Sequence, residues 1–276
     1  MAPIRDFDYT MLSTYMNCQR RFYFRHLLDL EGLGRQTAPE FGHAMHAGLN
    51  VWHQTRDLTK AIGAFKEDWT KSGGDTQEDS KRTLEKGTRI LKGYAVKYAD
   101  EPFKVLENEC PFEITMPNGL VYIGRRDRVI DWDGAIRVLE HKTSSQLGFS
   151  TFNAYNPNMQ ILGYIFSARQ KYPSCYAAVV DILQVAKTKE DYARKVETRT
   201  DDEIAQFPKL FNDIAQDVNE SIEKNRFVPN YSLCTYYGEC PYRRICMQSP
   251  ENWQRIIDSD YKKSHWDPRH TDDAGE

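Results

Sequence analysis

Two acidic side chains near a predicted β-hairpin are placed to hold a divalent cation. The dipeptide Asp133-Gly134 is typical of a two-residue hairpin loop. Counting back along both strands from that loop puts Asp127 directly opposite Glu140, with Cβ atoms about 4.5–5.5 Å apart. Two like charges at this separation destabilise a sheet unless something neutralises them. Hard cations bind carboxylate oxygens, so the pair predicts a site for Mg²⁺ or Mn²⁺.

The residues that follow Glu140 extend this site. Lys142 lies two positions further along the strand and therefore projects from the same face. His141 points to the other face, but its backbone carbonyl remains available to a metal. A cation of this kind polarises a phosphate and activates a water, and the lysine can orient or deprotonate that water or stabilise the developing charge. The alternative is a set of ordinary surface ion pairs.

Four cysteines suggest a second metal centre. Three of them fall within a short segment beside Gly238 and Pro241, so a shared metal site is a better interpretation than four unrelated thiols. Zinc and an iron–sulfur cluster both accept four thiolates, and both alternatives stay open on spacing alone. Cys110 and Cys175 lie in apolar contexts and are expected to be buried. The four candidate ligands are Cys18, Cys234, Cys240 and Cys246.

The elements that must position these residues follow from periodicity and turn signals. Helices are expected first, then three strands, a helix, a buried strand and a long helix, which predicts an α/β core with a helical N-terminal cap. The polar tail from about residue 264 is expected to be disordered. The expected helices are 9–29, 42–55, 59–70, 77–99, 154–171 and 201–225, and the expected strands are 105–116, 120–131, 135–141 and 175–185.

This order also predicts how the chain is organised. Residues 1–100 are expected to form a helical region that carries Cys18 and His46, and residues 101–200 are expected to form the core. Residues 201–263 would add the last helix and the cysteine loop, and residues 264–276 the tail.

Charge limits the partners of the protein. Lys and Arg total 37 against 40 Asp and Glu, and the formal net charge is −3. This balance excludes a uniformly basic surface that wraps duplex DNA, but it allows a local basic channel. Arg21 and Arg126 belong to arginine clusters that could line such a channel. We find no apolar run near the ~18–20 residues of a membrane span and no apolar signal region, so we expect a cytoplasmic protein.

Several short motifs in order resemble the PD-(D/E)XK nuclease superfamily, specifically its RecB-like branch. The segments Gly124-Arg-Arg-Asp127 and Leu139-Glu-His-Lys142 resemble its core, although the residue before the aspartate is arginine instead of proline. The remaining matches cover most of the chain between residues 9 and 246. They are Gly42-x-x-x-His46, Gln160-x-x-x-Tyr164, Ser13…Cys18-Gln-Arg-Arg-Phe and the cysteines 234, 240 and 246, whose Cys-x5-Cys-x5-Cys spacing departs from the usual Cys-x2-Cys start.

The resemblance implies roles for these residues. The fold would be a restriction-endonuclease-like mixed sheet flanked by helices. His46 would bind the metal together with the two carboxylates and the His141 carbonyl, and Lys142 would assist the attacking water. Gln160 and Tyr164 would contact the nucleic acid. The four cysteines would hold a 4Fe–4S cluster, with zinc as the alternative, that joins the two ends of the fold.

The resemblance implies a metal-dependent DNA nuclease, similar to CRISPR-associated RecB-like exonucleases and their phage relatives. The expected activity is exonucleolytic cleavage of single-stranded DNA ends to 5′-phosphate products. The expected partners are DNA with single strands or free ends, and recombination or replication proteins. The main alternative is a DNA-end-binding adaptor for recombination or spacer capture in which cleavage is incidental. A zinc-stapled scaffold unrelated to nucleic acids is a third possibility.

Overall fold

The computed structural model describes residues 2–34, 36–76, 79–236, 238–265 and 267–269. Its backbone contacts divide the chain into two compact units, which we call unit 1 and unit 2. Cys18 lies in unit 1 and His46 in unit 2, so the two units divide the chain differently from the consecutive regions that the sequence suggests. Unit 1 comprises residues 1–35, 111–124 and 206–276, and unit 2 comprises residues 36–110 and 125–205.

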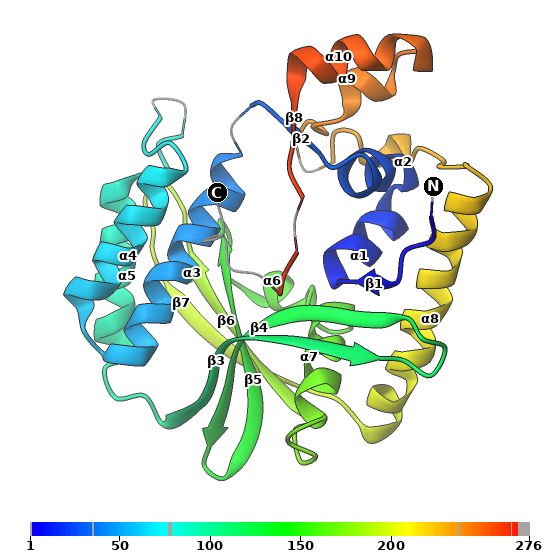
Figure 1. The fold of residues 1–276 in the computed structure, drawn as a ribbon. Coiled ribbons are helices and arrows are strands. Elements are labelled where there is room, and N and C mark those ends of the chain that lie inside the picture. Colours follow the sequence, from blue (N-terminus) through cyan, green and yellow to red (C-terminus); the bar gives the residue numbers. More distant parts are fainter. Residues whose placement is uncertain (1, 35, 77–78, 237, 266, 270–276) are drawn as a thin grey trace. The chain divides into compact units, whose positions relative to one another are not determined.

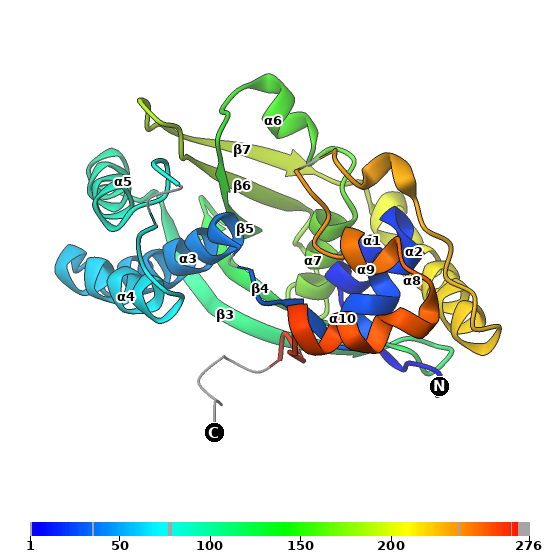
Figure 2. The ribbon, with the colours of Figure 1, turned by 90° about the horizontal axis from the view of Figure 1, so that it is seen from above.

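Unit 2 is built on a sheet with helices on both sides. Helices α3, α4 and α5 group together, and α7 lies on the other side of the strands (Figures 1 and 2). Strands β4 to β7 are neighbours in chain order; β5 and β6 are parallel, whereas the β4–β5 and β6–β7 pairs are antiparallel. This mixed, helix-flanked sheet confirms the predicted restriction-endonuclease-like class.

The elements of this unit, with strands β3 and β4 continuing into unit 1, have the following bounds. The helices are α3 (Thr37–Thr55), α4 (Leu58–Lys71), α5 (Leu84–Lys97), α6 (Phe149–Asn153) and α7 (Met159–Arg169). The strands are β3 (Phe103–Thr115), β4 (Val121–Trp132), β5 (Ala135–Ser144), β6 (Ala177–Gln184) and β7 (Tyr192–Thr198).

The β4–β5 hairpin has the predicted two-residue loop. Trp132 pairs with Ala135, and the register continues to Arg128. Asp133 has φ 54° and Gly134 has φ 79°, which are the left-handed conformations that a type I′ turn requires at both loop positions. The turn therefore matches the twist of the strands and determines which residues face each other further along.

The core of unit 2 lies between the helices and the sheet. Phe41 and Leu49 of α3, Phe65 of α4 and Leu91 of α5 are almost completely buried together with Leu183 of β6. Burial of such a side chain contributes about 1.5–3 kcal/mol. This shared apolar contact holds α3, and therefore its polar residues, against the sheet.

Several helix boundaries differ from those expected. Helix α3 begins at Thr37 instead of residue 42, because Pro39 falls in the first turn, where its missing N–H costs nothing. Helix α5 begins at Leu84 instead of residue 77, because the Lys86 N–H donates to the Thr83 hydroxyl at 3.1 Å and caps the helix. Residues 77–78 lie outside the described residues.

Strand β7 was not predicted from the sequence. Its residue Glu197 and the following Arg199 are buried although they are charged, and the side chain of Arg194 is only 8% exposed. Alternation of apolar and polar residues is the main signal of a half-buried strand. That signal is lost here because ion-paired charged residues occupy buried positions in place of hydrophobic side chains. Glu197 is an example, since its Oε1 lies 2.7 Å from Lys195 Nζ.

Unit 1 gathers segments from both ends of the chain and from the middle. The expected helix 9–29 is broken at Cys18, whose backbone is extended (φ −161°, ψ 107°). Strand β2 pairs antiparallel with β8, and β1 pairs with the start of β4. Its elements are β1 (Asp6–Phe7), α1 (Tyr9–Asn17), α2 (Gln19–Phe22), the π-helical turn η1 (Tyr23–Leu27), β2 (Leu30–Gly32), α8 (Asp201–Glu223, whose first turn belongs to unit 2), η2 (Tyr231–Leu233), α9 (Arg243–Cys246), η3 (Pro250–Asn252), α10 (Trp253–Asp260) and β8 (Tyr261–Lys263).

Aromatic and aliphatic packing stabilises unit 1. The rings of Phe24 and Tyr242 stack at 5.8 Å, and those of Tyr242 and Tyr261 at 5.7 Å. Ile245 and Ile256 complete this buried cluster. The cluster joins the segment after α2 to the C-terminal helices, because its members come from both ends of the chain.

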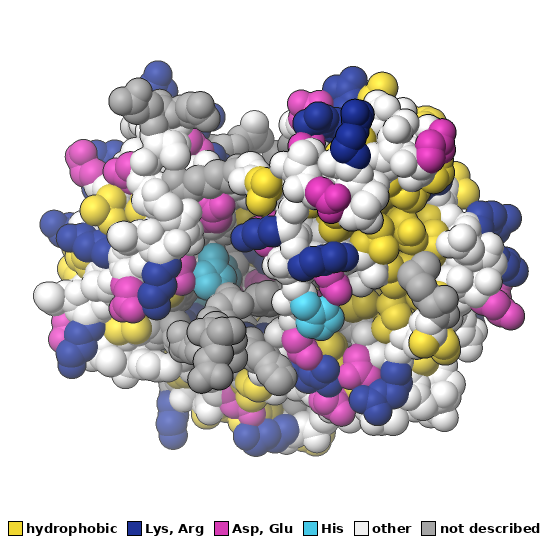
Figure 3. Space-filling model, turned by 45° about the horizontal axis from the view of Figure 1, so that its top comes forward, with side chains coloured by type: hydrophobic (Ala, Val, Ile, Leu, Met, Phe, Trp, Pro, Cys, Tyr) yellow, Lys and Arg dark blue, Asp and Glu magenta, His cyan; other side chains and the backbone are white. Residues whose placement is uncertain are grey.

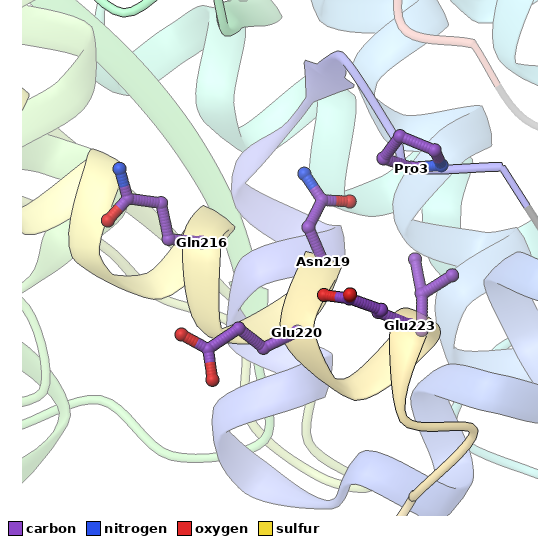
Figure 4. A pocket seen from close by; sticks show the side chains of 6 residues that line it. Pro3, Gln216, Asn219, Glu220 and Glu223 are labelled. Carbon is purple, nitrogen blue, oxygen red and sulfur yellow. The ribbon is translucent and has the colours of Figure 1, made fainter.

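A cavity of about 410 Å³ also lies in unit 1, beside the N-terminal segment and α8 (Figure 4). Asn219 in its wall bonds both the N–H and the carbonyl of Ile4, so its amide serves to attach the N-terminal segment to the helix. The cavity is lined by Pro3, Gln216, Asn219, Glu220, Ile222 and Glu223.

The surface carries both signs of charge. Figure 3 shows lysine and arginine side chains spread among aspartate and glutamate side chains, with hydrophobic side chains gathered on the right of the view. None of the described helices is long and apolar enough to cross a membrane. Of the tail expected to be disordered, residues 266 and 270–276 lie outside the described residues, whereas Arg269 forms ion pairs with Asp6 and Glu113.

Candidate active site

The β4–β5 hairpin of unit 2 brings the two predicted carboxylates together. Continuing the observed register by one pair beyond Arg128 and Leu139 puts Asp127 opposite Glu140. The two residues are only 8% and 2% exposed. The Lys142 ammonium donates to Glu140 Oε1 at 2.7 Å. The three predicted catalytic residues therefore converge at one place on two adjacent strands.

Helix α3 adds His46 to this place. Its Nδ1 lies 3.3 Å from Asp127 Oδ1. Four residues earlier, a Cβ at Gly42 would lie 3.4 Å from the Thr143 hydroxyl, which shows how closely the first part of α3 approaches the end of β5. The small residue and the histidine share one face of the helix, so close packing at one supports the contact at the other.

Strand β3 contributes an acidic residue that the sequence analysis missed. Glu109, His46 and Asp127 each offer a ligand atom, and these three atoms lie within 4.8 Å of one another. Glu109 has φ 47°. The turn between β3 and β4 could have predicted the position of Glu109. In this turn the Met116 N–H donates to the Leu120 carbonyl at 2.7 Å, so these two residues are paired. Counting back from that pair puts Glu109 opposite Asp127.

Burial and mutual charge shift the ionisation of these residues in different directions. Burial, followed by the charge of Asp127, raises the pKa of Glu140 to about 7. Burial alone would raise the pKa of Asp127, but the charge of His46 and the hydrogen bond from its ring hold it well below its usual range. Burial alone would lower the pKa of Lys142, but Glu140 outweighs it and leaves the pKa raised. The site thus contains one firmly ionised carboxylate, one that readily takes a proton, and a charged lysine.

These residues fit a divalent cation. Among the described residues, Glu140 Oε2 is buried without a hydrogen-bond partner, which is costly for a carboxylate oxygen. Burial and the charge of Asp127 also raise the pKa of Glu109, as expected where acidic groups crowd together without a counter-ion. Carboxylate oxygens with one imidazole suit Mg²⁺ or Mn²⁺.

His141 lies between Glu140 and Lys142 on β5, and its main chain and side chain do different things. The main-chain N–H donates to Asp127 Oδ2 at 2.7 Å. The imidazole is 1% exposed, and burial together with the charge of Arg128 lowers its pKa to about 4. Its backbone therefore belongs to the site, while its neutral side chain is enclosed in the protein.

Gln160 and Tyr164 lie on α7, in the same unit. The Gln160 amide donates to the Tyr164 hydroxyl at 3.2 Å, so the two residues share a helix face as their spacing predicts. Tyr164 is mostly buried and Gln160 is partly exposed. Their contact with nucleic acid stays a prediction.

The two predicted arginine contacts differ in setting. Arg126 is buried; its guanidinium donates to Ser167 at 2.9 Å and to Glu107 at 2.8 Å. This guanidinium therefore joins β4 to β3 and α7, and its contact with nucleic acid stays a prediction. Arg21 belongs to unit 1, and its charge lowers the pKa of the Cys240 thiol against the larger effect of burial.

All four candidate cysteine ligands belong to unit 1. The Asn230 N–H donates to Cys18 Sγ at 3.3 Å, and the Cys240 N–H donates to the Cys234 carbonyl at 2.9 Å. Burial raises the pKa of the Cys246 thiol, and the charges of the other three cysteines raise it further. No three cysteine sulfurs among the described residues lie within 4.8 Å of one another.

Comparison with known proteins shows the class to which this α/β fold, with an Asp, a Glu and a Lys on adjacent strands, belongs. The family model of the PD-(D/E)XK nuclease superfamily matches residues 7–247. The chain therefore belongs to this superfamily, which confirms the predicted nuclease class and, with it, DNA as the substrate class. The RecB-like branch stays a prediction.

A solved structure among the matches shows a similar fold. The crystal structure of a protein from Eubacterium rectale named Putative exonuclease has a TM-score of 0.51 and 14% sequence identity, and the match covers 93% of this chain and 92% of that one. The crystal structure of SSO0001 has a TM-score of 0.36 and 13% identity, with 90% and 88% covered. No curated protein sequence matches the chain.

Proposed function

We propose that this protein is a divalent-metal-dependent deoxyribonuclease that degrades single-stranded DNA from its ends and leaves 5′-phosphates. The observation that carries the proposal is the convergence of Asp127, Glu140 and Lys142 with His46 and Glu109 in one unit. Asp127 and Glu140 are buried and the other three residues are partly buried. Charged groups gathered in this way are costly to maintain in a purely structural role.

Asp127, Glu140, His46 and the carbonyl of His141 would hold Mg²⁺ or Mn²⁺, with Glu109 as an additional ligand. When bound, the cation polarises the scissile phosphate and lowers the pKa of a water nucleophile. The buried Glu140 Oε2 without a hydrogen-bond partner and the crowding of three carboxylates support this assignment.

Lys142 would act on the reacting groups. Its raised pKa keeps the ammonium charged at neutral pH, so it serves as a hydrogen-bond donor. From its position beside Glu140 Oε1 it would orient the attacking water and stabilise the negative charge that develops on the phosphate.

The segment after β5 supports a preference for unpaired DNA. Phe149 on α6 comes seven residues after Lys142 and is 80% exposed. The Tyr155 phenol, further along this segment, is close enough to contribute to the raised pKa of Lys142. Exposed aromatic rings stack on unpaired bases, so Phe149 would hold a nucleotide next to the scissile bond, with Gln160 and Tyr164 as further contacts.

The cysteines of unit 1 would hold a 4Fe–4S cluster as a structural staple. Burial raises the pKa of the Cys246 and Cys240 thiols, and the charges of Arg20 and Arg21 oppose this rise only in part. The other three cysteines are near enough to raise the pKa of Cys246 further. A tetrahedral zinc site also accepts four thiolates, so zinc is the alternative to the iron–sulfur cluster.

End-labelled single-stranded DNA of both polarities, the matching duplex and a circular single strand test the nuclease proposal. We expect cleavage of the linear single strand with Mn²⁺, no cleavage with chelator, and slow or no cleavage of the circle. Cleavage of the circle at the rate of the linear strand would instead assign an endonuclease. Binding of DNA ends without cleavage would favour the adaptor function. Because single-stranded ends arise in recombination and replication, proteins of those processes are the proposed partners.

A further inference from the structure

The sheet register of unit 2 lines up three polar residues behind the candidate active site. His141 on β5 pairs with Asp181 on β6, which pairs with Arg194 on β7. The Arg194 guanidinium donates to Asp181 Oδ2 at 2.8 Å. It also forms two hydrogen bonds to Glu101, at 2.7 and 2.9 Å. All of these side chains are buried.

Helix α5 places the Tyr94 hydroxyl over this row. It donates to Asp181 Oδ2 at 2.6 Å and accepts from Arg194 at 2.7 Å. It also lies 3.3 Å from His141 Nε2. Tyr94 therefore connects the ion pairs to the imidazole. We call Glu101, Arg194, Asp181 and Tyr94 the buried network.

Arg128 determines which nitrogen of His141 carries the proton. Its guanidinium lies 2.9 Å from His141 Nδ1. A guanidinium only donates hydrogen bonds, so Nδ1 accepts and the proton of the neutral ring is on Nε2. That N–H then donates to Tyr94, which donates to Asp181. The hydrogen bonds therefore run in one direction, from Arg128 Nη1 through His141 and Tyr94 to Asp181 Oδ2.

His141, which is bound to the buried network through its ring, contacts the candidate metal site through its backbone. The His141 N–H donates to Asp127 Oδ2 at 2.7 Å. The same residue separates Glu140 from Lys142 along β5. Any rotation of the His141 peptide would therefore displace Glu140 and Lys142 and break the hydrogen bond to Asp127.

We propose that Tyr94 and Asp181 are positioning residues that hold the His141 imidazole and thereby the backbone on which the carboxylates and lysine are arranged. The proposal deepens the proposed nuclease function and rests on it. Within the buried network Arg194 pairs with both Asp181 and Glu101, and Glu101 also lies 3.8 Å from the Arg56 guanidinium. Both buried carboxylates are therefore paired with a cation, which a buried polar network requires in order to persist.

The variant Tyr94→Phe tests the proposal because it removes one hydroxyl and keeps the ring. We expect Mn²⁺ affinity, measured by calorimetry, to fall about 10–100-fold, as for other groups that orient metal ligands. We expect kcat to fall with it, while KM for single-stranded DNA stays close to that of the parent. A structural role alone would not separate kcat from KM.

Tyr192→Phe is the matched control. The hydroxyl of Tyr192 on β7 donates to the carbonyl of Ile90 at 2.7 Å, and Ile90 lies on α5, the helix that carries Tyr94. The Tyr192 ring packs edge-on against the Tyr94 ring. Its loss should lower the melting temperature without changing Mn²⁺ affinity. Equal losses of affinity in both variants, or affinity in Tyr94→Phe within about twofold of the parent, would overturn the proposal.

Nitrogen-15 NMR of the His141 ring in the metal-free protein gives a readout that requires no activity, and its result for the parent requires no variant. We expect the Nε2–H tautomer in the parent and a changed Nε2 shift in Tyr94→Phe. An Nδ1–H tautomer in the parent would refute the positioning role even if the enzyme is active. A parent that neither binds Mn²⁺ nor cleaves DNA, but has the expected tautomer, would overturn the nuclease proposal and leave the network assignment standing.

Discussion

The carboxylates of unit 2 and the cysteines of unit 1 differ in how far apart their members lie along the chain. Asp127 and His141, which bond directly, are 14 residues apart. Cys18 and the Asn230 backbone that bonds its sulfur are 212 residues apart. A short hairpin turn determines the first arrangement, whereas packing between both ends of the chain determines the second.

The two regions also differ in burial and hydrogen bonding. Asp127 and Glu140 are buried and accept hydrogen bonds from a backbone N–H and an ammonium. The candidate cysteine ligands are partly exposed. The carboxylate site is preorganised by its own two strands, so it should keep its geometry when unit 1 is destabilised. The cysteines come from distant segments, so their arrangement should depend on the metal that they bind. The following five experiments test this difference, in order of their expected effect on the carboxylate site.

Glu140→Gln should have the largest effect. The change keeps the shape of the side chain and removes a charge that the metal requires. We expect at least about a thousandfold loss of cleavage, because metal stabilisation contributes several kcal/mol and about 1.4 kcal/mol corresponds to a factor of ten. Circular dichroism should show an intact fold. A purified variant that cleaves at the parent rate would show that the active site is elsewhere.

Lys142→Ala should reduce cleavage about 10²–10³-fold, since a positioned donor of this kind contributes that much. Mn²⁺ affinity should be retained, because the ammonium acts on the water or phosphate. Calorimetry that shows Mn²⁺ binding lost together with activity would assign the lysine a role in maintaining Glu140 instead.

The pH dependence should follow Glu140, whose pKa burial and Asp127 raise to about 7. Below pH 7 a proton competes with the metal, so Mn²⁺ affinity should fall by up to about tenfold per pH unit and level off above pH 7. Because the folded state binds this proton more tightly than the unfolded state, Glu140 should stabilise the protein less as pH rises from about 4.5 to 7. Urea titrations should show this slope in the metal-free parent and not in Glu140→Gln.

Phe149→Ala should weaken the use of single-stranded DNA about tenfold in KM, because base stacking on an exposed ring contributes about 1–3 kcal/mol. The kcat value and Mn²⁺ affinity should be unchanged. Leu210→Ala, which also removes an exposed apolar side chain, is the control. Equal KM values for Phe149→Ala and the parent would remove Phe149 from the proposed DNA path.

Cys234→Ala should have the smallest effect on the carboxylate site and a large effect on unit 1. We expect less bound iron, a weaker absorbance shoulder near ~400 nm and a lower melting temperature, while the soluble fraction binds Mn²⁺ with parent affinity. Cys110→Ala, outside the set, should keep its iron. Anaerobically purified parent with about four irons supports the cluster; a colourless parent with one zinc would replace the iron–sulfur assignment and leave the nuclease assignment intact.

Local signals in the sequence were sufficient for the hairpin. Asp133-Gly134 specifies a turn of one length and one handedness, and the period of two along each strand then places Asp127, Glu140 and Lys142 on one face. The order of helices and strands likewise predicts the mixed α/β class, because amphipathic helices can bury their apolar faces only against a sheet or one another.

Only the tertiary structure shows which residues of other elements contact that hairpin. Glu109 joins the site through a strand that curves at a left-handed residue, and Arg126 turns inward to Glu107 although its neighbours in sequence suggest a phosphate contact. Strand β7 was missed because Arg194 is buried by pairing with charges from α5–β3 and β6. Local sequence patterns report solvent exposure and backbone preference, whereas a buried ion pair is stable only when both partners are already in place.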